Sequence, residues 1–214
     1  MHFRDMIDKG LRPNPDIERS VYQYGMALDS TESDWDAVWS KYLHETVAQE
    51  KENLLLALAS TRIPYLIERL LEAALHEEGI RRQDFFTLIG YVSSNQIARP
   101  LLWDWIRTHY EVLVERFTVE DRNFGKMVPS FVSSFNTERD LYEVLEFFDS
   151  YPNAGAGLRP REAAAASIRK NILWMNAFRP QVIDWLRSNV MSRGKGVEEE
   201  EEVEEEEEVE EEEE

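Results

Sequence analysis

The chain has 214 residues, 43 of them acidic and 24 basic, which gives a formal net charge of −19. Fifteen glutamates and two valines fill positions 198–214, so 28 acidic and 24 basic side chains, a net charge of −4, belong to the residues before them. That body has no basic stripe to neutralise phosphates, which excludes nucleic acid as its main ligand, while 43% hydrophobic residues overall are enough for a folded core.

Cysteine is missing from the sequence, which removes disulfides, thiolate metal sites and cysteine nucleophiles. The first residues, Met1–Asp5, lack the apolar run of a signal peptide. No stretch reaches the roughly 18 uninterrupted apolar residues of a membrane helix. We therefore expect no membrane segment in this chain and a cytoplasmic location for the chain as it stands.

Helical periodicity predicts α-helices along nearly the whole body. Ser33 and Asp36 fit a capping box at the start of one long helical segment. Pro64 fits the first turn of the next helix, and Gly79 fits a left-handed cap at its end. A shorter helix is predicted over 83–91.

Pro100 opens the next predicted helix, and another follows over 124–132, where Pro129 is expected to kink or end it. Thr137 and Asp140 then form a second capping-box pattern. These signals indicate that helix follows helix through this part of the chain.

The glycine-rich loop 151–157 separates these helices from two more, around 162–174 and 180–186. About eight helices with broad apolar stripes and short connections predict an all-α fold. Between a closed bundle and a stack of helix pairs, we favour a right-handed stack of antiparallel pairs, a HEAT/armadillo-like α-solenoid. We expect one helical domain over 1–191 and a disordered polyglutamate tail over 192–214.

Neither His44-Glu45 nor His76-Glu77 is followed by the second histidine of an H-E-x-x-H zinc motif. The four histidines, at positions 2, 44, 76 and 109, offer no pair of ligands on one helix face. No G-x-S-x-G elbow or phosphate-binding glycine loop is present, and the glycines of 154–157 indicate a flexible turn. We therefore expect no catalytic and no metal-binding residue in this chain.

Other features allow more than one interpretation. The aromatic residues, at helical spacing, favour a core over a cofactor site. The segment Arg81-Arg82-Gln83-Asp84 fits a helix cap with local ion pairs, or arginines that recognise a carboxylate or a partner surface. The acidic tail fits a solvating extension, or a binder of basic proteins or divalent cations.

Several short segments, taken together and in order, resemble one family. They are Trp35-Asp36-x-Val38-Trp39-x-x-Tyr42, Glu50-Lys51, Leu54-Leu55-x-Ala57-Leu58-Ala59-x-Thr61, Arg81-Arg82-Gln83-Asp84, Ser94-Asn95, Ala98-Arg99-Pro100-Leu101-x-Trp103-Asp104, Phe135-x-Thr137, Glu143-Val144-x-x-Phe147-Phe148, Ile168-x-x-Asn171-Ile172-x-Trp174 and Trp185-Leu186. This series resembles the C-terminal helical domain of the aminopeptidase N family of zinc exopeptidases, over about 15–189. The resemblance implies stacked helix pairs that form a bowl over a separate catalytic domain and restrict the access of peptides to it.

The H-E-x-x-H and G-x-M-E-N motifs of that family do not occur in these 214 residues, so no catalytic or metal residue carries over. The resemblance therefore implies a chain that is inactive alone, with zinc expected only in a catalytic domain outside it. The implied partners are that catalytic domain and its peptide substrates. As residues that contact a peptide or partner we select Arg82, Arg99 and Trp103, because arginine and aromatic groups are useful in concave sites.

The resemblance starts partway into the helical domain, so we expect an N-terminal truncation that leaves an uncapped apolar end near residues 17–42 and self-association through it. As part of a longer ectoenzyme, the chain is expected at a membrane or in the secretory pathway instead. The alternative function is a free-standing helical interaction scaffold whose acidic tail binds basic partners.

Overall fold

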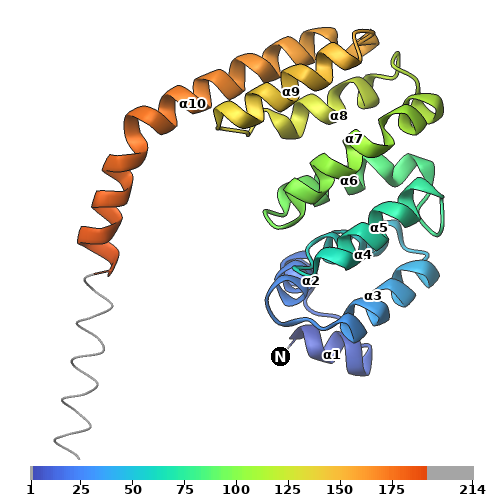
Figure 1. The fold of residues 1–214 in the computed structure, drawn as a ribbon. Helices are drawn as coiled ribbons and strands as arrows, with labels where there is room; N and C mark the ends of the chain where they lie inside the picture. The colour runs from blue at the N-terminus through green and yellow to red at the C-terminus, as the bar shows by residue number, and fades with distance from the viewer. Residues whose placement is uncertain (1, 192–214) are drawn as a thin grey trace, which may run out of the picture. The chain divides into compact units, whose positions relative to one another are not determined.

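The computed structural model describes residues 2–191, and within them the chain is α-helical with no strand (Figure 1). The predicted all-α fold is therefore confirmed, whereas the predicted acidic tail, 192–214, lies outside the described residues. The α-helices are α1 (His2–Lys9), α2 (Pro15–Asp29), α3 (Glu32–His44), α4 (Ala48–Ala59), α5 (Pro64–Leu75), α6 (Phe85–Ser94), α7 (Ala98–Phe117), α8 (Arg122–Val132), α9 (Glu138–Ser150) and α10 (Leu158–Leu186). Shorter helical turns are η1 (Arg82–Asp84), η2 (Gly155–Gly157) and η3 (Arg187–Met191).

The chain divides into two compact units. The first comprises the residues up to Phe131 together with Phe147–Arg161, and the second comprises Val132–Glu146 and the residues from Glu162 onward. Within the first unit, α2 and α3 pack on α4, α4 packs on α6, and α5 and α6 pack on α7. Packing between helices close in sequence is typical of stacked pairs. The solenoid arrangement of the whole chain stays a prediction.

Helix α1 packs against α2 and α3 in the first unit. It buries Phe3 and Met6, and Gly25 of α2 lies so close to Phe3 that a Cβ there would approach the ring to 2.2 Å. Part of the predicted apolar end is therefore covered by a helix of the chain itself. Tyr24 and Leu28 of α2 remain exposed beside it.

The start of α3 differs from the predicted capping box. Thr31, not Ser33, is the N-cap: its hydroxyl accepts the Asp34 N–H at 3.3 Å, and the Asp34 carboxylate accepts the Thr31 N–H at 2.8 Å. The prediction of one long helical segment here is also wrong. The Glu45 carboxylate accepts the backbone N–H groups of Thr46 and Val47, at 2.8 and 2.7 Å, and so stabilises a break between α3 and α4.

Two other predicted helix starts are confirmed, at α5 and at α9. Pro64 is the first residue of α5, and the Asp140 backbone N–H donates to the Thr137 hydroxyl at the start of α9. The prediction that Gly79 ends this helix is wrong: Gly79 has the predicted left-handed backbone, with φ 85°, but α5 ends at Leu75, four residues earlier. Glu77, with φ 58°, is the first left-handed residue after the helix.

Prolines do not end helices where they were expected to. Helix α8 continues past Pro129 to Val132, and α10 runs unbroken through Pro180, where two separate helices were predicted. Because proline has no N–H, the carbonyl of Asn176 loses the donor that a helix normally supplies four residues later. Figure 1 shows that α10 bends in its C-terminal half.

The tryptophans were expected in the core, and three of them, Trp35, Trp103 and Trp105, are buried. Trp174 and Trp185 of α10 are instead 50% and 60% exposed, so for them the expectation is wrong. Their helical spacing with Phe178 and Val182, which are also exposed, makes an apolar stripe along α10. The periodicity is that of a buried helix face, but within the described residues nothing covers it.

Two asparagines hold loops in the same way, one in each unit. The Asn95 amide donates to the carbonyls of Ala59 and Thr61, at 3.0 and 2.7 Å, in the loop between α4 and α5. The Asn171 amide donates to the carbonyls of Ser133 and Phe135, at 2.9 and 3.0 Å, in the loop between α8 and α9. In both cases the two accepting carbonyls are two residues apart. Each asparagine therefore ties a loop between two helices to a third segment of its own unit.

Candidate functional site

Arg82 and Arg99, two of the predicted contact residues, both donate hydrogen bonds to backbone carbonyls of the first unit. The Arg82 guanidinium donates to the carbonyl of Arg116 and lies 5.2 Å from the centre of the Phe117 ring, at the end of α7. Arg99 donates from Nε to the Ser93 carbonyl at 3.1 Å, in the first turn of α7. The two arginines are therefore near opposite ends of a helix, about 25 Å apart along its axis.

Trp103, the third predicted contact residue, is only 5% exposed. Its ring packs edge-on against Phe131 and Phe147, with ring centres 5.9 and 5.2 Å apart, and Arg107 lies over it at 5.1 Å. Trp103 thus contributes to the core of the first unit. The role in peptide or partner contact assigned to Arg82, Arg99 and Trp103 stays a prediction, and the structure does not gather the three into one site.

A large hollow lies in the second unit, and we call it the α10 hollow. It has a volume of about 780 Å³. One side is the start of α9, with Asn136, Thr137 and Glu138. The other side is one face of α10 and the turn after it, to which Ile172, Asn176, Arg179, Ile183 and Arg187 contribute.

The loop side of the α10 hollow is fixed by hydrogen bonds. Asn171 holds the carbonyls of Ser133 and Phe135, as described above, and Thr137 caps α9 through Asp140. Since the Thr137 oxygen accepts the Asp140 N–H at 3.1 Å, the Thr137 hydroxyl hydrogen can donate to another group. The hollow therefore has one preformed wall with a donor on it.

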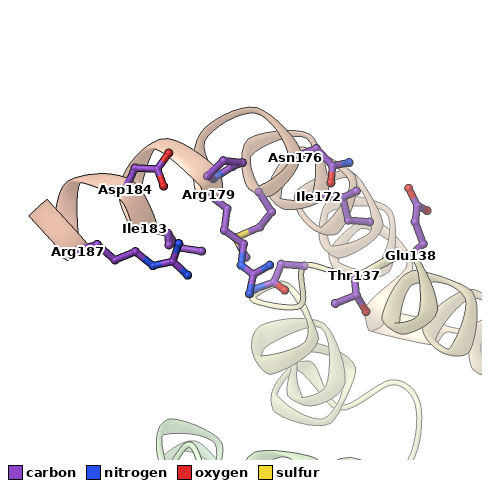
Figure 2. A pocket seen from close by; sticks show the side chains of 11 residues that line it. Thr137, Glu138, Ile172, Asn176, Arg179, Ile183, Asp184 and Arg187 are labelled. Atoms are coloured by element: carbon purple, nitrogen blue, oxygen red, sulfur yellow. The ribbon is translucent and has the colours of Figure 1, made fainter. Parts of the chain in front are cut away.

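Arg179 and Arg187 provide the positive charge of the α10 hollow. Within residues 2–191 neither guanidinium has a hydrogen-bond or ion-pair partner. Figure 2 shows both side chains extending from the same edge of α10 as Ile183, with Arg179 on the side of the loop that carries Thr137. The amides of Asn136 and Asn176 add further donors to the lining.

Two carboxylates, Glu138 and Asp184, also line the α10 hollow. Figure 2 shows the Asp184 carboxylate at the other edge of α10 from the two arginines, and Glu138 at the far end of the hollow. Neither forms an ion pair with Arg179 or Arg187 in the described part of the chain. The side of the hollow with Arg179 and Arg187 can therefore bind hydrogen-bond acceptors. Glu138 and Asp184 make the rest of its lining polar.

The resemblance implies zinc only in a catalytic domain outside this chain, and the histidines of the described residues are arranged in a different way from zinc ligands. His76 and His109 each approach Glu72, with nitrogen–oxygen distances of 3.6 and 3.7 Å, and the Trp105 indole donates to the same carboxylate at 2.6 Å. Zinc ligands converge at about 2.0–2.2 Å from one metal. Over 2–191, no three His, Asp or Glu side chains are grouped so that they could hold a metal ion.

Arg179 and Arg187 were not among the predicted contact residues, although the sequence contains a signal for them. Residues 172, 176, 179, 183 and 187 recur at the spacing of one helix face. Placing a helix end before Pro180 interrupted that register and concealed the shared face.

Comparison with known proteins identifies the family. The family described as ERAP1-like C-terminal domain matches residues 2–170, most of the chain. The chain belongs to this family. The Arg179 and Arg187 side of the α10 hollow lies beyond the matched residues.

Individual relatives are aminopeptidases. The chain is 38% identical over 180 residues to glutamyl aminopeptidase of Bitis rhinoceros, covering 84% of this chain and 19% of the relative. It is 40% identical over 168 residues to glutamyl aminopeptidase of Mus musculus, covering 78% and 18%. Aminopeptidase N of Oryctolagus cuniculus is 29% identical over 178 residues, covering 82% and 18%.

The chain thus spans about a fifth of the length of the curated relatives it matches. Among the helices of residues 2–191, none combines the length and the apolar character needed to cross a membrane.

Proposed function

We propose that this chain is part of the C-terminal helical domain of an aminopeptidase, where it helps to close a peptide-binding chamber over a catalytic domain that lies elsewhere in the enzyme. The observation that supports this is the family match over 2–170, together with relatives named as aminopeptidases of which the chain spans about a fifth. In this role the chain contributes shape and weak polar contacts rather than catalytic groups.

Two properties of the chain agree with a closing role. In this proposal the chemistry of peptide hydrolysis belongs to the catalytic domain, because the H-E-x-x-H and G-x-M-E-N motifs that the resemblance implies do not occur in these 214 residues. The exposed apolar stripe of α10, Trp174, Phe178, Val182 and Trp185, offers a surface for a large, mostly apolar domain contact.

The test is to co-express this chain with mouse glutamyl aminopeptidase from which the matched C-terminal region has been removed. We expect the two to co-purify in moderate salt, because an apolar domain contact is little screened. We also expect the complex to cleave long peptides more slowly, relative to a short amide substrate, than the truncated enzyme does.

Intact mouse glutamyl aminopeptidase is the control, since its own C-terminal region should exclude the added chain. If the chain stays unbound to the truncated enzyme while the intact enzyme is active, the proposal is wrong. Salt-sensitive binding of the chain to basic proteins, lost when the glutamates of 198–214 are removed, would favour the interaction scaffold instead.

A further inference from the structure

Two carboxylates meet inside the first unit, where α2 packs on α4. Glu50 of α4 is 5% exposed, and Glu18 of α2 is half-buried beside it. The hydroxyl of Tyr22 is 2.8 Å from one oxygen of Glu50 and 3.4 Å from one oxygen of Glu18, and it has a single hydrogen to donate. The second oxygen of Glu50 is buried and has no partner within residues 2–191. When both carboxylates are ionised, the pair therefore has more buried acceptors than donors.

Positive charge near the pair is limited. Arg12, in the loop between α1 and α2, is 3.7 Å from Glu50, but its closer partner is Glu45, at 3.1 Å. The Asn53 amide donates to Glu18 at 3.3 Å and carries no charge. The two ionised carboxylates therefore repel each other with little compensation.

Charged and titratable groups on the other helices around α4 have partners of their own. They are Tyr91 of α6 with Glu52, Lys51 with the ring of Tyr42 of α3, and Arg69 of α5 with Asp36. The groups that act on the Glu50 carboxylate are accordingly Glu18, Tyr22 and Arg12.

A proton on Glu50 supplies the missing donor. The protonated carboxyl group has an O–H that can donate to Glu18, while its other oxygen still accepts from Tyr22. The repulsion between the two carboxylates disappears at the same time. We propose that the Glu18–Glu50 pair is a pH-sensitive contact, which holds α2 on α4 more firmly in mildly acidic than in neutral solution.

The direction of the effect follows from the state of Glu50 in the packed helices. Burial and the Glu18 carboxylate raise the pKa of Glu50, although the Tyr22 hydrogen bond opposes them. A pKa raised by packing gives a stabilisation that is complete below the ordinary glutamate pKa and is lost as the pH rises through the raised value. The N–H groups of Val47 and Thr46 instead lower the pKa of Glu45, so its contact with Arg12 persists where Glu50 titrates.

Loosening of this contact acts on the two N-terminal helices together, since α1 packs on α2. Tyr22 and Met26 of α2 and Phe3 and Met6 of α1 are all buried. Local opening of α1 and α2 therefore exposes apolar side chains, and it should be more frequent at neutral than at mildly acidic pH.

The experiment is hydrogen–deuterium exchange of the full chain, measured by mass spectrometry from mildly acidic to mildly alkaline pH. After correction for the intrinsic pH dependence of amide exchange, the rates give an opening constant for each segment. In the wild type, the opening constant of α2 should increase with pH, by at most about tenfold per pH unit because a single proton is linked to it. Residues 132–146 of the second unit are the internal control and should not show this increase.

Substitutions then assign the effect to the pair. Glu50→Gln has an amide that can donate to Glu18 at every pH, so the opening constant of α2 should be low and nearly independent of pH. Glu18→Gln removes the repulsion from the other side and should also reduce the pH dependence. The double variant should add little to either single one, since each removes the same interaction. Glu68→Gln, at an exposed glutamate of α5, is the matched control and should follow the wild type.

The proton itself can be followed in the wild-type chain, independently of any variant. In an NMR titration of isotope-labelled glutamate side chains, the carboxyl signal connected to the Glu50 amide should change at a higher pH than that of Glu68, because the pKa of Glu50 is raised. The proposal is overturned if this signal changes with or below that of Glu68, or if α2 opening in the wild type does not depend on pH. It is also overturned if either Glu50→Gln or Glu18→Gln retains the wild-type pH dependence, or if residues 132–146 open with pH as much as α2 does.

Discussion

The hydroxyl of Tyr22 donates a hydrogen bond of 2.8 Å to the buried carboxylate of Glu50, between α2 and α4. The other oxygen of Glu50 has no partner in the described part of the chain. Arg12 is the nearest cation, 3.7 Å away, and Glu18 adds a second carboxylate, 3.4 Å from the Tyr22 hydroxyl. Burial, with the nearby Glu18 carboxylate, raises the pKa of Glu50 above its ordinary value.

The first prediction concerns the pH dependence of stability. Because its pKa is raised in the folded state, Glu50 gains its proton more readily there than in the unfolded chain as the pH falls. Ionised Glu50 therefore lowers the free energy of unfolding at neutral pH, and this effect disappears as the pH falls through the folded-state pKa. We expect Glu50→Gln to be at least as stable as the wild type at neutral pH. As the pH falls toward mildly acidic values, the free energy of unfolding should rise less for Glu50→Gln than for the wild type.

Urea unfolding at a series of pH values measures this. Glu111→Gln, at an exposed site on α7, is the control and should follow the wild-type curve. A Glu50→Gln curve parallel to that of the wild type would contradict the assignment.

The second prediction concerns Tyr22 itself. Tyr22→Phe removes the one hydrogen bond of the buried Glu50 carboxylate that is shorter than 3 Å. We expect a loss of about 1–3 kcal/mol in the free energy of unfolding at neutral pH, since a buried acceptor is left without its donor. In the Glu50→Gln background the loss should be smaller, because an uncharged acceptor is less costly to leave unpaired. Equal losses in both backgrounds would show that Tyr22 stabilises the fold through packing alone.

The third prediction concerns two glycines that touch. A Cβ on Gly125 would lie 2.7 Å from the backbone nitrogen of Gly157, and one on Gly157 would lie 2.7 Å from the Gly125 oxygen. Backbone atoms cannot rotate away, so Gly125→Ala should destabilise the first unit by about 2 kcal/mol or more. Gly90→Ala in α6 is the control: its Cβ meets nothing within 4 Å, and alanine should stabilise the helix by up to about 1 kcal/mol. Thermal unfolding of the two variants should shift in opposite directions.

The turn at 154–157 is held in place by residues that are distant in the sequence. The glycines of 154–157 indicated a flexible turn, but η2 there is anchored by the Ala156 N–H, which donates to the Val119 carbonyl at 2.9 Å. Gly155, with φ 47°, sits against the same residue. Nothing local to 154–157 encodes that approach, because Val119 and Gly125 come from a distant part of the sequence.

Helix type and most helix positions follow from local signals, such as Pro64 at a first turn or Thr137 before Asp140. The two N-terminal helices were missed, although Asn14 before Pro15 is a start signal: the Asn14 side chain accepts the Asp16 N–H at 3.0 Å. The continuation of α10 through Pro180 could not be predicted. Proline generally destabilises the interior of a helix, and tertiary contacts decide whether a particular helix tolerates it.

The role of Arg82, Arg99 and Trp103 stays a prediction, and their contacts within the fold could not be predicted for a related reason. Arg82, Arg99 and Trp103 were selected for residue type within motifs, and two of them donate to backbone carbonyls while the third is packed in the core. Whether an arginine is used by the fold depends on carbonyls brought to it by other helices. Sequence alone does not provide that information, whereas the unpaired state of Arg179 is evident once the structure is known.

The fourth prediction tests self-association through the end near residues 17–42. Leu28, on α2, is 74% exposed and is the most exposed large apolar side chain of the first unit. If two copies associate through that end, Leu28→Lys should weaken the association by about tenfold or more. The substitution removes a leucine that would be buried in the contact and places a charge there. Tyr142→Lys, at an exposed site on α9, is the control. Sedimentation velocity over a range of concentrations measures both, and a wild-type chain that remains monomeric throughout would refute this prediction.

The fifth prediction concerns the asparagines of the two units. Asn95→Ala and Asn171→Ala each leave two loop carbonyls without their donor, and each should cost about 1–3 kcal/mol. Because the two sites belong to different compact units, hydrogen exchange should rise mainly in the loop after α4 for Asn95→Ala and in the loop after α8 for Asn171→Ala. Asn123→Ala, at an exposed position in α8, should change neither. Hydrogen–deuterium exchange with mass spectrometry resolves these segments, and an Asn171→Ala variant that exchanges faster throughout both units would show that the units unfold together.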